Sequence, residues 1–375
     1  MVMRAYIFIL CMLVATHIHG QKNVVNLYDA IGKPEKVVLL SDIASDIRYI
    51  PLETTADALI GGGYDITFTG DAIIASSSDN YSFYHFDKQG KYMNKIGKKG
   101  QGPGEYNVGL FYFLDMSKRH FYTHDWNATY CYTYEGEFIQ KIETPNLNMG
   151  VAEMLGEDMI TYSNDLYYGK NIEPYQLYVV GLNGKPVHKF KGYIEEGKKY
   201  GLNLTTRDYM YVFNGDTYFK PALENKVYKV SKATPKKKSL VWDFYTKNKD
   251  VDVTRNELNP QNRMKSLSIF RLKETNRYMF VLYGLENKVY LGMYDKSQKN
   301  FQNIRIEDDL SGGIDFVPSG KSPEGFLINA YFPKAIKENE KYGTGKLPDR
   351  VNDLKKLLVE MDDEDNPVLI LVTLK

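Results

Sequence analysis

A short internal repeat constrains the fold of this chain more than any other feature of its sequence. The pentapeptide Glu-Asn-Lys-Val-Tyr occurs twice, at 224–228 and 286–290, and each copy stands between two apolar runs typical of β-strands. Looser copies lie at 79–81 and 125–130, each followed by alternating aromatic residues. Self-similarity of this kind indicates a repeat architecture. The repeated unit is a strand, an Asn-containing turn and a second strand.

A second turn follows the early copies of this unit. Gly90, Gly136 and Gly184 stand at positions where a tight hairpin needs a positive φ, and they are spaced by 46 and 48 residues. That spacing fits a blade of four strands, at about 40 to 50 residues per repeat. The sequence therefore predicts an all-β fold, a six-bladed β-propeller of four-stranded antiparallel blades. We place the blades at 64–105, 106–149, 150–200, 201–255, 256–310 and 311–375.

Two strand-like segments precede the first blade, and we expect them to close the ring. Residues 37–40 and 47–52 are rich in Val, Leu and Ile, as is the final segment at 368–374. Pairing of an N-terminal strand from 37–52 with the final strand would remove the open edge of the last blade.

One amphipathic helix is predicted in the last blade. Asp349 is placed as its N-cap, and Asn366-Pro367 as the signal that stops it. An apolar stripe of this length usually packs on the local core, here the sixth blade. The stripe consists of Val351, Leu354, Leu357, Leu358 and Met361.

The first 20 residues have the pattern of a secretory signal peptide. Arg4 precedes an apolar run at 5–15 that is too short to span a bilayer, and Gly20 is a small residue at the expected cleavage point. We expect residues 1–20 to be removed, leaving 21–375 as a single exported domain in the periplasm or at the cell surface. An N-terminal core strand and an uncleaved anchor are the alternatives.

The two cysteines bear on anchoring and on stability. Cys11 lies in the predicted signal peptide, so the mature chain would keep Cys131 alone and form no internal disulfide. A lipid anchor on Cys11 is disfavoured because the preceding residues, 8–10, lack the small side chains expected before an acylated cysteine. The mature chain is expected to have no transmembrane span.

Charge and motifs exclude several classes of function. The chain has 48 Lys and Arg against 47 Asp and Glu, with no long block of one sign, which argues against a nucleic-acid partner. No Gly-x-Ser-x-Gly elbow, phosphate loop or clustered His and Cys pattern occurs. The sequence therefore favours a binding protein over an enzyme and predicts no cofactor. A propeller can nevertheless gather a channel calcium from different blades, as a metal-dependent lactonase does, so a channel-metal hydrolase or lyase is the alternative.

Three segments carry a resemblance to a known family. Residues 96–106, Ile-Gly-Lys-Lys-Gly-Gln-Gly-Pro-Gly-Glu-Tyr, resemble the Gly-rich blade connection of NHL-type propellers. Together with 45–54 and 365–369 they are similar to six-bladed β-propeller proteins abundant in Bacteroides-type bacteria. Blades two to six lack the Gly-x-Gly-Pro-Gly-Glu loop. The resemblance implies an envelope location and a noncatalytic binding or scaffolding role.

One face of the propeller is expected to carry the ligand site. Connections in an antiparallel blade alternate between two faces, so the Gly-rich loop (residues 98–106), the turn at 124–127 and the insertion at 164–175 should share a face. Trp126 could stack on a sugar ring or on a side chain of a protein partner, although burial against the next blade is the alternative. We predict a glycan or protein ligand there. The candidate residues are Gln101, Glu105, His124, Trp126 and Tyr168.

Overall fold

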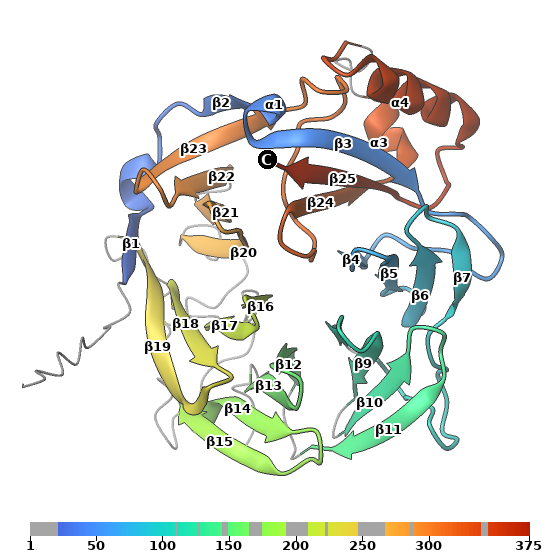
Figure 1. Cartoon of the computed structure of the whole chain (residues 1–375), viewed down its shortest axis with the longest axis vertical. Coiled ribbons are helices and arrows are strands. Elements are labelled where there is room, and N and C mark those ends of the chain that lie inside the picture. The colour runs from blue at the N-terminus through green and yellow to red at the C-terminus, as the bar shows by residue number, and fades with distance from the viewer. Residues whose placement is uncertain are drawn as a thin grey trace, which may run out of the picture.

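The strands of this protein form six sheets arranged in a ring, as the computed structural model shows (Figure 1). The predicted fold class, a six-bladed β-propeller, is confirmed. The first strand of each blade lies nearest the axis, and later strands lie progressively further out (Figure 1). The structure describes residues 22–109, 111–125, 128–144, 149–164, 175–192, 209–221, 224–246, 267–285, 288–338 and 344–375.

Blades one to three are four-stranded antiparallel meanders in which each strand pairs with the next along the chain. Blade one comprises β4 (Tyr64–Phe68), β5 (Ala72–Ser77), β6 (Ser82–Asp87) and β7 (Tyr92–Lys95). Blade two comprises β8 (Phe111–Asp115), β9 (His120–His124), β10 (Ala128–Thr133) and β11 (Phe138–Glu143). Blade three comprises β12 (Met149–Leu155), β13 (Met159–Asn164), β14 (Tyr175–Gly181) and β15 (Pro186–Lys191).

Blades four and five each carry a fifth, parallel strand from the N-terminal part of the chain. Blade four comprises β16 (Tyr209–Phe213), β17 (Asp216–Lys220), β18 (Lys226–Ser231) and β19 (Thr234–Tyr245), with β1 (Asn23–Asn26) at its outer edge. Blade five comprises β20 (Ser268–Glu274), β21 (Tyr278–Leu285), β22 (Lys288–Asp295) and β23 (Asn300–Glu307), with β2 (Lys36–Leu39) at its outer edge.

Blade six closes the ring, with three strands in the order β24 (Phe326–Tyr331), β25 (Val368–Leu374) and β3 (Ala44–Pro51). The outermost strand, β3, pairs antiparallel with β25, and Arg48 lies opposite Leu371. Closure by an N-terminal strand is therefore confirmed. The segment at 37–40 does not join this closure, because β2 pairs with blade five and a short helix, α1 (Leu40–Ile43), turns the chain into β3.

The N-terminal strap, which we define as residues 23–51, therefore runs along the outer edges of blades four, five and six (Figure 1). A 3-10 turn, η1 (Tyr28–Ala30), carries it from blade four to blade five. Strands that add to an outer edge satisfy its backbone groups and cover it against other chains. Three of the six blades are protected in this way by the chain itself.

The predicted helix is α4 (Pro348–Glu360), which packs on blade six together with α3 (Pro333–Lys337). Its buried side chains Val351, Leu354 and Leu358 belong to the predicted stripe. The predicted N-cap is wrong by two residues: Leu347 occupies that position, Pro348 begins the helix, and Asp349 lies in the first turn. Proline suits the first turn because it lacks the N–H that has no helical partner there. No helix in the described ranges is long and apolar enough to cross a bilayer.

Aromatic side chains fill the spaces between neighbouring blades. Between blades one and two, the ring of Phe83 lies 4.8 Å from that of Phe121. Between blades four and five, the ring of Trp242 lies 5.4 Å from that of Tyr294, nearly perpendicular to it. Ring pairs at these distances stabilise the core beyond the burial of their area. Many of the Tyr and Phe side chains of the chain therefore pack between adjacent blades and stabilise their contacts.

Candidate functional site

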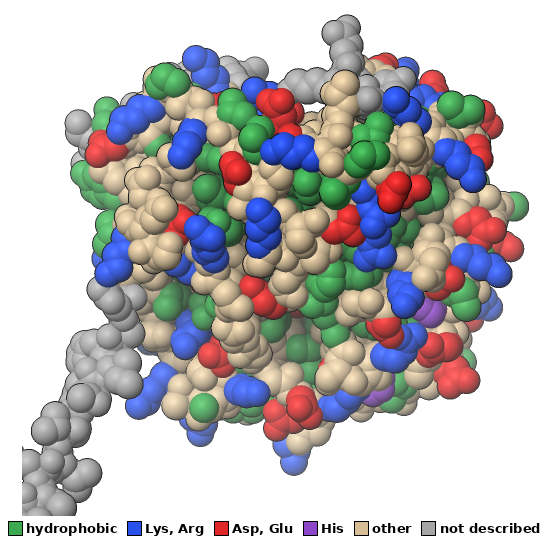
Figure 2. Space-filling view, turned by 45° about the horizontal axis from the view of Figure 1, so that its top comes forward, with side chains coloured by type: hydrophobic (Ala, Val, Ile, Leu, Met, Phe, Trp, Pro, Cys, Tyr) green, Lys and Arg blue, Asp and Glu red, His purple; other side chains and the backbone are tan. Residues whose placement is uncertain are grey.

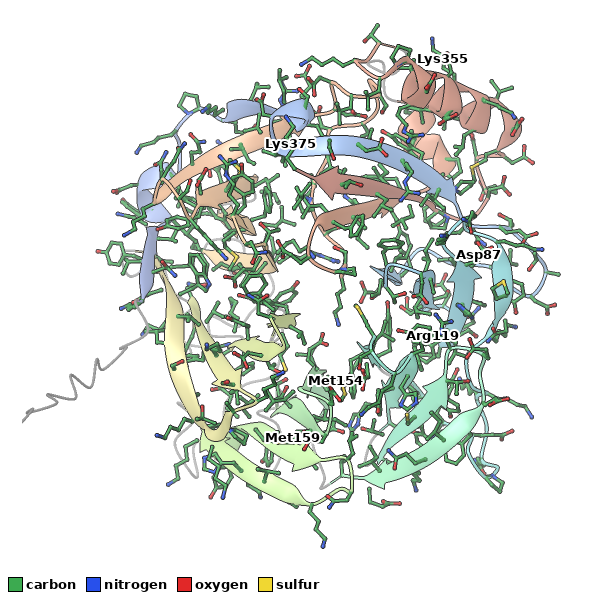
Figure 3. The ribbon with its side chains drawn as sticks, viewed as in Figure 1. Asp87, Arg119, Met154, Met159, Lys355 and Lys375 are labelled. Carbon is green, nitrogen blue, oxygen red and sulfur yellow. The ribbon has the colours of Figure 1, made fainter. Side chains whose placement is uncertain are left out.

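A cavity of about 390 Å³ lies on the axis of the ring. Its walls come from the innermost part of all six blades, and Figure 3 labels Met154 of β12, which borders it beside the centre of the ring. We call it the channel cavity. One polar or aromatic residue from each blade, in order from one to six, is Thr67, Tyr112, Glu153, Tyr209, Lys273 and Lys321.

An ion pair crosses the channel. Lys321 precedes β24 in blade six, and its Nζ lies 2.5 Å from Oε1 of Glu153 in blade three, on the opposite side of the ring (Figure 1). Glu153 is 5% exposed. Burial raises the pKa of Glu153 against the attraction of Lys321. Burial opposes the charge on Lys321 as well, but Glu153 and Asp65 outweigh it and raise the pKa of Lys321, so the ammonium group is held protonated.

The segment that carries Lys321 is fixed to blade one. The Phe68 N–H donates to the Lys321 carbonyl oxygen over 3.0 Å, and Thr67 bridges Lys321 in a parallel register. The hydroxyls of Thr67 and Tyr112 lie 3.0 Å apart, which joins blade one to blade two. The polar groups around the ion pair are therefore bonded to neighbours in adjacent blades, and this holds their positions.

A second buried carboxylate, Glu274 of β20, lies in the wall between blades four and five. Nζ of Lys296 is 2.7 Å from its Oε1. Its Oε2 accepts hydrogen bonds from the Tyr211 hydroxyl at 2.6 Å and from Nε1 of Trp242 at 3.3 Å. Burial raises the pKa of Tyr211 well above its ordinary value, and the charge of Glu274 adds to this effect. The hydroxyl therefore stays protonated and donates a hydrogen bond to Glu274.

Lys273 reaches the cavity from the same strand. Its Nζ donates to the carbonyl oxygen of Ser322 at 3.0 Å and to the hydroxyl of Ser322 at 2.8 Å. Burial lowers the pKa of Lys273 to about 8, and the charge of Glu324 only partly opposes this. The half-buried rings of Tyr209 and Phe213 form part of the adjoining wall.

The channel cavity opens on the face formed by the turns that follow the first strand of each blade. Met116, Gly156 and Asn214 lie in three of these turns and line it. The Gly-rich loop and the turn after β9 lie on the other face, since connections in a meander alternate. The cavity and the sequence-predicted site are thus at opposite ends of the channel. Figure 2 shows that the charged side chains of both signs are interspersed over the visible surface.

The predicted residues of the Gly-rich loop have structural contacts of their own. Gln101 is exposed, whereas Glu105 accepts a hydrogen bond from the Gly102 N–H at 2.9 Å and pairs with Nζ of Lys98 at 2.9 Å. The hydrogen bond from Lys98, followed by that from Gly102, lowers the pKa of Glu105. A Cβ at Gly100 would lie 1.9 Å from a carboxylate oxygen of Glu105, so a side chain there would displace that carboxylate.

His124 lies in the core between blades two and three. It is 1% exposed, its Nδ1 is 3.0 Å from the Thr129 hydroxyl, and its ring stacks on Phe111 at 5.2 Å. Burial lowers the pKa of His124 to about 4, so the imidazole is neutral at neutral pH.

The Gly-rich loop and the turn after β9 do meet, because the Asn107 N–H donates to the Asp125 carboxylate at 2.8 Å. Trp126 and Tyr168 lie outside the described residues. Ligand binding at the five predicted residues stays a prediction.

Sequence reasoning missed the channel cavity. The blades contribute short stretches to it that lie some 40 to 60 positions apart in the chain, so no local motif marks them. One signal was a charge in an unusual place, because Glu153 interrupts an otherwise apolar strand. In the described ranges, no group of three or more His, Cys, Asp or Glu side chains lies so as to hold a metal ion. The channel-calcium alternative stays a prediction.

Comparisons with known proteins agree with this architecture. A family model described as a domain of unknown function (DUF4934) matches residues 22–373. The chain belongs to this family. This DUF4934 chain is similar to a crystal structure of a Bacteroides fragilis protein thought to be exported, with 18% identity, a TM-score of 0.73, and coverage of 95% of this chain and 100% of the other. That likeness shows a shared fold.

A second solved structure is more distant. The DUF4934 chain aligns with a member of the DUF4221 family from Bacteroides vulgatus at 10% identity and a TM-score of 0.48, covering 88% of this chain and 97% of the other. A comparison with curated proteins finds no match. The likeness to the Bacteroides fragilis structure confirms the propeller fold that the resemblance implied, while membership of the NHL-type group stays a prediction.

Proposed function

We propose that this protein is an exported binding propeller of the bacterial envelope that holds a glycan or protein ligand in the channel cavity. The observation that carries the proposal is the cavity itself. Ligand sites are concave, largely apolar, and contain a few fixed polar groups. The channel cavity has this character, with Tyr and Phe walls around the Glu153–Lys321 pair and Lys273.

The polar groups in the cavity are positioned before any ligand arrives. Thr67, Tyr112 and Glu153 are each hydrogen-bonded or ion-paired to a residue of another blade. A site that is already ordered loses little conformational entropy when it binds. Export is supported by the signal-peptide pattern at 1–20 and by the similarity to the Bacteroides fragilis protein thought to be exported.

A matched pair of variants tests the site. Val212 of β16 is 45% exposed and lines the cavity, whereas Val289 of β22 is 55% exposed and lies outside it. We expect Val212→Trp to fill the opening and Val289→Trp to leave it unchanged. Purified wild-type protein and both variants would be applied to a glycan array and to immobilised, purified envelope proteins.

The expected result is a ligand that binds wild type and Val289→Trp and is lost with Val212→Trp. Thermal melting of the three proteins controls for misfolding. A ligand bound equally by all three proteins would place the site elsewhere, for example on the face of the Gly-rich loop. If the wild-type protein binds no glycan and no envelope protein, the proposal is refuted.

A further inference from the structure

Lys273 is a half-buried lysine of the channel cavity that forms no ion pair with a carboxylate in the described residues, a feature it shares with the exposed Lys232. Its ammonium group has three N–H donors. Two of them are used on the backbone carbonyl and the hydroxyl of Ser322. In the part of the chain that the structure describes, no carboxylate forms an ion pair with Lys273, although Glu324 exerts a weaker attraction from further away. One donor and most of the positive charge remain available to a ligand.

Two buried acids of the cavity are ion-paired at hydrogen-bond distance, whereas Oδ2 of the third, Asp115, accepts no hydrogen bond from the described residues. Glu153 pairs with Lys321 and Glu274 with Lys296. Asp115 lies 3.6 Å from Nζ of Lys118 and accepts hydrogen bonds from Ser117. The exposed Glu157 and Glu324 also line the cavity, so a negative group is favoured at Lys273 itself and not throughout the cavity. At Lys273 an incoming anion would find an ammonium group with one unused donor.

The walls of the channel cavity fit a ligand that contains a sugar ring with hydroxyl groups. Tyr209 and Phe213 are half-buried and line the cavity, and Nζ of Lys296 lies over the Phe213 ring, 4.7 Å from its centre. Ser322 and the Glu153–Lys321 pair supply both donors and acceptors within the same cavity. A wholly apolar ligand would leave these polar groups without water or partners, which costs free energy. A sugar ring meets both requirements, with apolar C–H faces for the aromatic surface and hydroxyls for the polar groups.

We propose that the channel cavity binds a saccharide unit bearing a carboxylate or phosphate, with its anionic group on Lys273 and its ring against Tyr209 and Phe213. This inference rests on the proposed function and names the ligand class for the same cavity. Carboxylate and phosphate share the required chemistry, because both accept charge-assisted hydrogen bonds from an ammonium group.

Binding of such a ligand depends on pH in a defined direction. Glu324 is the charged group that acts on Lys273. Three further charged residues lie next to Lys273 or to its partner Ser322 and have partners of their own: Glu274 pairs with Lys296, Lys321 pairs with Glu153, and Arg271 donates to the Ser319 carbonyl oxygen. With a pKa near 8, Lys273 is protonated below neutral pH and loses its charge above pH 8. Affinity for an anion should therefore be constant below about pH 7 and fall above pH 8, approaching tenfold per pH unit.

The test uses three defined probes: glucuronate, glucose 6-phosphate and glucose. Their affinities for the purified chain would be measured by ligand-observed NMR and calorimetry at pH 6.5 and pH 9. We expect at least one acidic sugar to bind roughly tenfold more tightly than glucose at pH 6.5 and to lose that advantage at pH 9. Comparison of the two acids shows whether the anionic group is a carboxylate or a phosphate.

Three variants test whether Lys273 causes the preference for acidic sugars. Lys273→Met should abolish the preference for acidic sugars, and Lys288→Met, at an exposed position of β22 outside the cavity, should keep it. Lys273→Arg keeps the charge at high pH, so it should bind the acid equally at pH 6.5 and pH 9. This variant also keeps the inference testable if Lys273→Met fails to fold.

Several outcomes overturn the inference. Equal affinity for glucose and for both acids, or failure of both acids to bind at 10 mM, refutes the ligand class. A preference for acids that survives in Lys273→Met refutes the role of Lys273. A ligand found on the glycan array and lost with Val212→Trp would still support the proposed function in each case, so the two failures are distinguishable.

Discussion

Asn366 joins the two ends of the chain, and its replacement should destabilise the ring. The side chain is buried, with 2% exposure. Its Oδ1 accepts a hydrogen bond from the Ile60 N–H at 2.8 Å, and its Nδ2 donates to the carbonyl oxygens of Glu53 at 2.9 Å and Ala58 at 2.6 Å. All three side-chain bonds cross from the segment before β25 to the segment that leads from the N-terminal strap into blade one.

The magnitude follows from these contacts. Asn366→Ala removes three hydrogen bonds, each with a net value of about 1 kcal/mol, and leaves buried backbone groups of Ile60 and Ala58 without a partner. We expect the free energy of unfolding to fall by about 2 to 4 kcal/mol. Urea denaturation followed by tryptophan fluorescence measures this as a lower midpoint with an unchanged slope.

Asn107→Ala is the matched control. Asn107 is exposed, and its side chain makes no hydrogen bond to the described residues, so its loss should change stability by less than about 0.5 kcal/mol. A loss of under about 1 kcal/mol for Asn366→Ala would refute the reasoning. It would mean that water replaces the side chain or that the two segments are held by other contacts.

Other parts of the structure lead to three further predictions. Deletion of residues 22–39 removes β1, η1 and β2 with the buried Val25 and Leu27 and should lower the melting temperature, whereas deletion of 22–52 also removes β3 and should cause aggregation. Size-exclusion chromatography separates the two outcomes. His124 takes up a proton near pH 6.5 in the unfolded chain but only near pH 4 in the folded chain, so the free energy of unfolding should fall as the pH drops through this range. The fall should be less steep in His124→Gln. Acid titrations of unfolding that give the same slope for both proteins would contradict this. Glu153→Gln or Lys321→Met alone should cost about 3 to 5 kcal/mol by leaving a buried charge unpaired, and the double variant should cost less than the sum, which a double-mutant cycle measures.

Much of the fold was predictable because blades repeat a local rule. Gly90, Gly136 and Gly184 all have positive φ in the structure, as the hairpins they were assigned to require. The alternation of apolar residues and the turn chemistry depend only on neighbours in the sequence. Such signals survive even when the copies of a repeat have diverged.

The helix shows where local rules were insufficient. The periodic stripe was enough to predict α4, but its first residue was not. An acidic residue at position 349 resembles an N-cap, yet Pro348 can begin a helix and shifts the cap to Leu347. Two residues that both favour a helix start compete at this point, and pattern alone does not rank them.

The channel cavity was not predictable for a different reason. Glu153 and Lys321 lie 168 positions apart, and only the ring geometry brings them together. The prediction instead favoured segments with conspicuous sequence, such as the Gly-rich loop. The glycine content there reflects the needs of a tight turn, since Gly104 has a φ of 74°.

The N-terminal landmark at 45–54 and the C-terminal landmark at 365–369 are the two sides of one closure. β3 must find β25 across more than 300 intervening residues, and a slip of one residue would turn its apolar face outward. Asn366 favours the observed register, because its own N–H donates to the Thr54 hydroxyl at 2.8 Å while its side chain donates to the Glu53 carbonyl oxygen at 2.9 Å. Backbone pairing alone tolerates several registers, whereas these side-chain contacts fit one. Specific polar residues at the two ends of the chain are therefore needed to define where the ring closes.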